Sequence, residues 1–136
     1  MDAVDYRTEI ESLHTFFVDW FTGVANSTAF DQVERALAPD YEMVTPSGAV
    51  HDRDATLSSI RDSHAVYEPG SFDIDIRNVE IISQRSEVSI VRYEEWQQYE
   101  EVTGRLSTAV FAPVQTGAAD QQALEWRYLQ ETWLDE

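Results

Sequence analysis

Cysteine and lysine are both absent from this chain of 136 residues, and so are long apolar runs. Without cysteine the chain can form no disulfide bond and offers no thiolate to a metal or a substrate. No apolar stretch approaches the roughly 20 residues of a membrane-spanning helix. The acidic start at residues 1–5 lacks the basic segment of a secretory signal. We therefore expect a single cytoplasmic domain covering residues 1–136, with no membrane partner.

Positive charge is also scarce. The chain has 26 acidic residues against 9 basic ones, all of them arginine, and its formal net charge is -17. Binding to nucleic acid requires a basic surface, so this charge argues against a nucleic-acid partner. An acidic surface without lysine is similar to that of proteins from salt-accumulating halophiles, because concentrated salt screens the repulsion between like charges. The alternative is an ordinary acidic protein that lacks lysine by chance.

Apolar residues at helical spacing predict a long amphipathic helix near the N-terminus. They are Ile10, Leu13, Phe17, Trp20, Phe21 and Val24. A second helix is expected to open near Thr28 and to end at Pro39. A third is expected to begin after Asp52 and to end before Pro69.

The other segments alternate between apolar and polar residues, which is typical of strands. A short strand is expected at residues 41–45, and long strands at 72–81, 87–100, 106–114 and 123–134. The predicted order is α-α-β-α-β-β-β-β, with long antiparallel strands and the helices on one face of the sheet. This order predicts an α+β fold.

Two segments resemble a known family. Residues 38–48 are similar to the segment after the second helix in the SnoaL-like branch of the nuclear-transport-factor-2-like superfamily, and residues 124–133 are similar to its last strand. The resemblance implies a cone: a curved, mostly antiparallel sheet wrapped around the long N-terminal helix, with a pocket at the open end. Such folds include isomerases, dehydratases, polyketide cyclases and domains without activity, so the fold alone does not choose a function.

The resemblance also implies which side chains line the pocket. Residues two apart on a strand share one face. Comparison with the isomerases places the face with Arg92 and Glu94 inside, and likewise the face of the last strand that begins with Trp126. The opposite assignment, with the Arg92 face exposed to solvent, stays open. The expected binding residues are Trp20, Tyr41, Thr45, Tyr67, Arg92, Glu94, Trp96, Thr108, Tyr128, Gln130 and Thr132.

Steroid-isomerase chemistry is not expected, because its catalytic positions carry other residues here. The position that resembles the base aspartate holds Thr45, and the donor tyrosine falls near Phe17. The donor aspartate falls near Ser107 or Thr108, which lie on opposite faces of one strand, so only one of them can point inward.

Four other residues are weak catalytic candidates as acids or bases, namely Glu94, His51, His64 and Asp40. The three histidines, His14, His51 and His64, are scattered along the chain without metal-ligand spacing, so no metal is predicted. The sequence also has no glycine-rich phosphate loop, and we expect no cofactor.

These patterns predict a small-molecule-binding domain with an apolar pocket and no assigned reaction. The ligand is expected to be apolar or weakly acidic, because an arginine in the pocket favours a carboxylate. One alternative is a cofactor-independent isomerase, dehydratase or cyclase that uses acid–base side chains. Another is a dimeric interaction module whose cone is filled.

The outer face of the sheet is expected to form a homodimer. With the pocket assignment given above, this face carries a patch too large to stay exposed on a monomer. Its members are Val91, Tyr93, Tyr99, Leu129 and Trp133. The two assignments depend on each other, since reversing the pocket face also reverses the outer face.

The charge leads to a first prediction. The melting temperature should rise markedly from low to multi-molar KCl, because salt screens the repulsion among the carboxylates. Differential scanning fluorimetry across a KCl series measures it. A melting temperature that stays flat across the series would contradict the halophile interpretation.

Overall fold

A six-stranded sheet curves around the N-terminal helix in the computed structural model, which describes residues 5–113 and 124–134. The helices are α1 (Tyr6–Phe21), the 3-10 helix η1 (Ser27–Phe30), α2 (Asp31–Ala36) and α3 (Arg53–Asp62). The strands are β1 (Leu37–Val44), β2 (Val50–Asp52), β3 (Asp73–Gln84), β4 (Ser89–Tyr99), β5 (Glu101–Pro113) and β6 (Leu124–Leu134). The predicted α+β order is confirmed, and β2 is the short strand that pairs back on β1.

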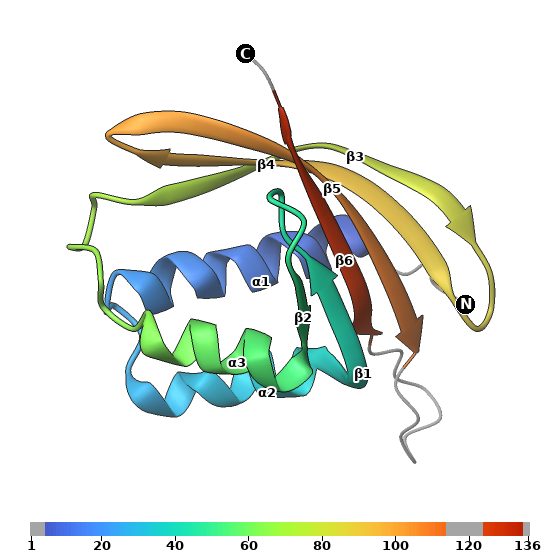
Figure 1. Cartoon of the computed structure of the whole chain (residues 1–136), viewed down its shortest axis with the longest axis horizontal. Helices are drawn as coiled ribbons and strands as arrows, with labels where there is room; N and C mark the ends of the chain where they lie inside the picture. Colours follow the sequence, from blue (N-terminus) through green and yellow to red (C-terminus); the bar gives the residue numbers. More distant parts are fainter. Residues whose placement is uncertain (1–4, 114–123, 135–136) are drawn as a thin grey trace.

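The sheet is mixed but mostly antiparallel. Its strands lie in the order β2-β1-β6-β5-β4-β3, and only the β1–β6 pair is parallel. Figure 1 shows the helices together on one side, with α1 running beneath the arch of β3, β4 and β5. The predicted cone around a long helix is therefore confirmed. Within residues 5–113 and 124–134, no helix is long and apolar enough to cross a membrane.

The first helix is fixed at both ends by local hydrogen bonds. The Asp5 carboxylate accepts from the backbone N–H of Thr8 at 3.0 Å, which caps the N-terminus. At the other end the backbone N–H of Thr22 donates to the Val18 carbonyl, and Gly23 follows with a φ of +77°. The face between these ends is buried and consists of Tyr6, Ile10, Leu13, His14, Phe16 and Trp20. One buried position is thus a histidine.

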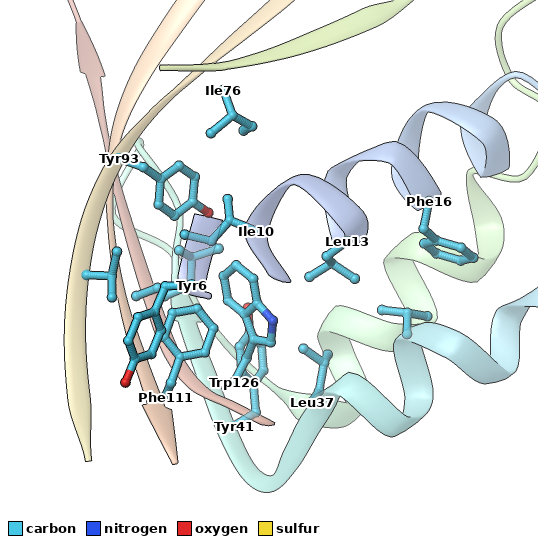
Figure 2. Packing of buried hydrophobic residues seen from close by; sticks show 14 of the residues in the cluster. Tyr6, Ile10, Leu13, Phe16, Leu37, Tyr41, Ile76, Tyr93, Phe111 and Trp126 are labelled. Carbon is cyan, nitrogen blue, oxygen red and sulfur yellow. The ribbon is translucent and has the colours of Figure 1, made fainter. Parts of the chain in front are cut away.

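Trp126 of β6 stands at the centre of the core between α1 and the sheet (Figure 2). It is 1% exposed, and its ring lies 4.6 Å from that of Phe111 and 6.2 Å from that of His14. Its indole N–H donates to the Glu9 carboxylate, so the buried ring keeps a polar partner. Burying an aromatic side chain of this kind contributes about 3 kcal/mol.

The predicted faces of β4 are reversed. Val91, Tyr93 and Glu95 are buried against α1, whereas Arg92 is exposed and pairs with Glu80 across the outer face. Both faces of this strand mix apolar and charged residues, so alternation alone does not choose between them. The choice depends on partners for a buried carboxylate, and those partners come from other elements.

The outer face of β4 also holds two more residues that were expected in the pocket. Glu94 accepts hydrogen bonds from Asn78 and from the indole N–H of Trp96. The Trp96 ring lies over Gly104 of β5, where an added Cβ would come within 2.6 Å of it. Because Gly104 has no side chain, it leaves room on the outer face for the Trp96 ring.

A β-bulge at Arg127 splits the residues that were expected to share one face of β6. Trp126 is opposite Phe111 and Tyr128 is opposite Val110, so Arg127 is the extra residue. Trp126 consequently points into the core. The residues that were wrongly placed inside, and that face outward with Thr108 of β5, are Tyr128, Gln130 and Thr132.

The composition of the outer face changes with these reversals. Val91, Tyr93 and Leu129 are buried inside the cone. Tyr99, which packs on Tyr67, and Trp133, which lies under the Arg105 guanidinium, share their side of the sheet, so the patch predicted for a dimer is wrong. The apolar side chains that face outward include Ile90, Leu106, Val110 and Tyr128, which are all partly buried.

Candidate functional site

A cavity of about 310 Å³ lies between α1, α3 and the inner face of the sheet. Most of its wall is apolar, with Leu13, Phe17, Met43, Ile60, Ile74 and Leu129 among the lining residues. Thr45, His51 and Ser59 also line it and are partly or fully exposed, so they mark the mouth. The buried polar lining residues mark the inner end, and four of them have acidic or basic side chains.

These four residues, His14, Glu95, Arg105 and Glu131, form what we call the charged cluster. Their side chains are 4%, 6%, 17% and 5% exposed, respectively. Isolated charges are costly at such burial, so pairing within the cluster is required. All four side chains line the cavity.

His14 links α1 to β4. Its Nδ1 lies 2.8 Å from the Ile10 carbonyl oxygen, and its Nε2 lies 3.1 Å from Glu95 Oε1. A carbonyl and a carboxylate both accept hydrogen bonds, so both ring nitrogens must donate. This geometry favours a charged imidazolium beside an ionised carboxylate. Burial alone lowers the pKa of His14, but the Glu95 carboxylate and the Ile10 carbonyl more than offset burial, so the pKa is raised.

Glu95 is ionised for the complementary reason. Burial raises its pKa, but His14, Arg105 and a 2.7 Å hydrogen bond from Gln97 Nε2 lower it more. The resulting pKa of Glu95 is about 2. Glu95 therefore remains a carboxylate throughout the physiological range.

Glu131 has less support. Its Oε1 accepts a hydrogen bond from Arg105 Nη1 at 3.1 Å, the one hydrogen bond that its carboxylate forms within the described residues. Burial raises the pKa of Glu131, and the nearby Glu95 carboxylate raises it further. Although Arg105 and His14 act in the opposite direction, the pKa of Glu131 is about 7. Near neutral pH this group can both accept and donate a proton.

The strand register brings the cluster together. Glu95 of β4 pairs directly with Arg105 of β5, and Ser107 of β5 pairs with Glu131 of β6. Arg105 and Glu131 are therefore diagonal neighbours on the inner face. The Arg105 guanidinium also lies over the Trp133 ring, 4.8 Å from its centroid.

Two buried hydroxyls lie next to the cluster. The Tyr93 and Ser107 hydroxyl oxygens have no hydrogen-bond partner among the described residues. Tyr93 and Ser107 are cross-strand neighbours, and Ser107, not Thr108, is the residue that points inward. Burial raises the pKa of Tyr93 well above its usual value, so this side chain stays neutral.

Several predicted site residues lie away from the cavity. Trp20 is a core residue, 2% exposed, whose indole N–H donates to the Ile60 carbonyl. His64 stacks on Trp20 and bonds the Ala25 carbonyl. Tyr67 stacks on Phe72 and does not line the cavity.

The remaining predicted residues divide between the cavity and the surface. Tyr41, Thr45 and His51 line the cavity, and their binding or catalytic roles stay predictions. Asp40 is exposed and forms an ion pair with Arg127. The described residues include no group of three or more metal-ligating side chains placed to hold a metal ion.

Sequence reasoning missed all four members of the charged cluster as site residues. The sequence did contain one signal: Glu95 and Glu131 each alternate with apolar or aromatic residues, Glu95 after Val91 and Tyr93 and Glu131 after Leu129. A carboxylate on a face that is otherwise buried indicates either a buried pair or a functional site.

Comparison with known proteins places the chain. Residues 7–135 match the family described as sucrose-6-phosphate phosphohydrolase C-terminal. An NTF2-like protein of unknown function from Pseudomonas aeruginosa is 30% identical, with 96% of this chain and 98% of that chain covered and a TM-score of 0.85. An NTF2-like protein of unknown function in nutrient uptake from Rhodospirillum rubrum shares the fold at 16% identity, with coverages of 96% and 99% and a TM-score of 0.64. Among curated proteins no match was found.

The raised pKa of Glu131 leads to a stability prediction. In the unfolded chain this carboxyl ionises near its ordinary pKa of 4.5, and in the folded protein near 7. The folded state thus binds more protons between these values, and wild-type stability falls as pH rises through this window. As pH rises from about 5 to 8, the free energy of unfolding of Glu131→Gln should increase by about 2 kcal/mol relative to that of wild type. Urea unfolding at constant KCl measures it.

A matched control for this prediction is Glu125→Gln, on the same strand but outside the charged cluster. Its stability relative to wild type should stay constant with pH. If Glu131→Gln and wild type lose stability in parallel, the carboxyl is not protonated in the folded protein near neutral pH.

Proposed function

The chain belongs to the sucrose-6-phosphate phosphohydrolase C-terminal family and has the nuclear-transport-factor-2-like fold, and from this premise we propose that it binds a small, largely apolar molecule in the cavity of the cone. One observation carries the proposal: an open, mostly apolar cavity of about 310 Å³ ends in a buried charged cluster. Small-ligand sites combine apolar walls with a few convergent polar groups in this way.

The residues that line the cavity indicate how the ligand is oriented in it. Apolar side chains of α1, β1 and α3, such as Phe17, Met43 and Ile60, surround the body of the ligand. Its polar end lies next to Arg105 and Glu131, since these are the charged groups at the inner end. Thr45 and His51 at the mouth are in reach of any part that projects toward solvent.

Acid–base catalysis is the second candidate function. It is favoured by Glu131, which lines the cavity with a pKa of about 7, close to the value at which a carboxyl serves best as general acid and base. An isomerase, dehydratase or cyclase reaction on the bound molecule would then start with proton transfer to or from Glu131. Glu94, His64 and Asp40 do not line the cavity and are not part of this proposal.

The family description names sucrose-6-phosphate, so sucrose and its phosphate belong among the compounds tested. The mostly apolar wall favours aromatic acids, polyketide-like ketones and terpenoid or steroid ketones over a sugar. With its net charge of -17, we propose that the protein does this in the cytoplasm of a halophile.

A homodimer through the outer face is a further part of the proposal. The outward side chains of the central strands β4 and β5 include Ile90, Leu106 and Val110, and none of the helices in the described part of the chain covers them (Figure 1). Arg92 and Glu94 on the same face supply charges of both signs. A two-fold axis through this face would bring the apolar strip of one chain against that of its copy.

The dimer leads to a prediction. Val110→Glu should turn the dimer into a monomer, because it places two like charges at the centre of the contact. Light scattering after size-exclusion chromatography in KCl measures the mass. Val24→Glu is the control, since Val24 is an exposed residue between α1 and η1 and does not lie on the outer face of the sheet. A monomeric wild type would contradict the proposal.

Ligand binding leads to a second prediction. In a thermal-shift screen at multi-molar KCl, one chemical class should raise the melting temperature, because a ligand that binds only the folded state stabilises it by mass action. Met43→Trp, which fills the cavity, should abolish that shift. Val44→Trp should retain it, because Val44 is the neighbouring residue on the opposite face of β1.

The same samples distinguish binding from catalysis. Mass spectrometry of the recovered compound shows whether it was converted, and loss of conversion in Glu131→Gln would support the enzymatic candidate. A shift that Met43→Trp leaves unchanged would mean that the compound binds outside the cavity. No shift for any class, sucrose 6-phosphate included, would count against the binding function.

A further inference from the structure

The charge of the cluster depends on one proton. Arg105 is always cationic, and His14 is cationic because both of its nitrogens face acceptors. Glu95 is an anion held by His14 and Gln97. With Glu131 ionised the cluster is neutral, and with Glu131 protonated it carries one positive charge.

Arg105 has hydrogen-bonding capacity left over. A guanidinium has five N–H donors, and within the described residues Arg105 uses one of them, from Nη1 to Glu131 at 3.1 Å. Its Nε–H is buried and has no partner in residues 5–113 and 124–134. Because the side chain lines the cavity, its terminal N–H groups are placed to reach a ligand there. The flat fork of a guanidinium matches the two oxygens of a carboxylate.

From the cavity, the cluster and this spare capacity we infer that the ligand carries a carboxylate, and that its binding at Arg105 is coupled to the uptake of one proton by Glu131. The inference rests on the proposed function and names the chemical class of the ligand. The cluster holds two cations, His14 and Arg105, and a ligand carboxylate would be the second anion beside them, after Glu95. Glu131, which shares Arg105 with it, then has to be neutral, since two carboxylates at one buried site repel each other.

Of the titratable groups around Glu131, most keep one protonation state, so the proton taken up on binding is assigned to Glu131. The charged or titratable side chains that face it from α1, β1, β4 and β5 are His14, Tyr41, Tyr93, Glu95 and Arg105. Burial raises the pKa of both tyrosines, so they stay neutral. Glu95, with a pKa of about 2, stays ionised, and Arg105 stays cationic. Burial lowers the pKa of His14, but the Glu95 carboxylate and the Ile10 carbonyl raise it above its ordinary value. The Glu131→Gln variant separates any effect of His14 from that of Glu131.

Because ligand binding is linked to protonation of Glu131, the affinity for a carboxylate ligand should change with pH in a definite direction. Glu131 ionises with a pKa of about 7, so below this pH the site already carries the proton that the ligand needs. Above it, binding has to take up the proton, and affinity for a carboxylate falls. Between about pH 6 and 8 the fall should be about tenfold. A neutral ligand of the same shape should show no such fall.

The test uses naphthoate and naphthamide, which share a ring system and differ in charge. The acid stays ionised throughout the pH range, so any pH dependence comes from the protein. Dissociation constants are measured by isothermal titration calorimetry at about pH 6, 7 and 8. The KCl concentration is the lowest that keeps the protein folded, which limits competition from chloride.

Wild type should bind naphthoate about tenfold more weakly at the highest pH than at the lowest, with proton uptake visible as a buffer-dependent heat. Glu131→Gln, which keeps the shape of the protonated acid, should bind naphthoate as tightly at all three pH values as wild type does at the lowest. Arg105→Gln should lose naphthoate binding and keep naphthamide binding. Glu125→Gln should behave as wild type does.

Each other outcome overturns the inference. If naphthoate binding to wild type does not change with pH, Glu131 takes up no proton. If the pH dependence persists in Glu131→Gln, the proton belongs to His14. If naphthamide binds and naphthoate does not, the ligand class is wrong while the proposed binding function stands. If neither compound binds at any pH, the inference fails, and the wider compound screen decides the binding function separately.

Discussion

The buried contact between His14 and Glu95 is the constraint on which the rest of the structure depends. It joins α1 to β4 through the core and decides which face of β4 turns inward. Transferring two charges from water to the protein interior is costly. Mutating only one partner of such a buried pair typically lowers the stability of a protein by about 3–5 kcal/mol, because the other charge is left unpaired. The carbonyl of Ile10 and the amide of Gln97 complete the hydrogen bonds of the pair. The cone therefore closes around a satisfied ion pair and not around a purely apolar core.

The second pair, Arg105 with Glu131, is built on the same sheet but is less completely satisfied. It lies on β5 and β6, and within the described residues Glu131 has a single hydrogen-bond donor. The difference between the two carboxylates follows from their surroundings: Glu95 has three partners that favour its charge, and Glu131 faces Glu95. One carboxylate is thus fixed in its ionised form, and the other is poised to exchange a proton at the inner end of a mostly apolar cavity.

This arrangement explains why family resemblance gave the fold and misplaced the site. The positions that resemble the catalytic residues of steroid isomerases hold Thr45, Phe17 and Ser107 or Thr108, and Phe17 is part of an apolar wall. The buried charged residues of the strands that line the cavity lie instead on β4, β5 and β6. A shared backbone can carry chemistry at different positions, because inward residues of several strands, here Glu95, Arg105 and Glu131, line the same cavity.

The sequence by itself determined the α+β order, the long N-terminal helix and the acidic composition, because spacing, turn residues and composition are local properties of the chain. The cone was implied by the family resemblance of residues 38–48 and 124–133. The tertiary structure alone decided which strand faces point inward. Glu94 and Glu95 lie on faces of β4 that both mix apolar and charged residues, and a histidine from α1, an arginine from β5 and Gln97 make burial of Glu95 possible. The bulge at Arg127 likewise reverses the parity of β6 without any signal in the alternation. The energy of a buried charge depends on partners far apart in the chain, so local patterns could not place the site.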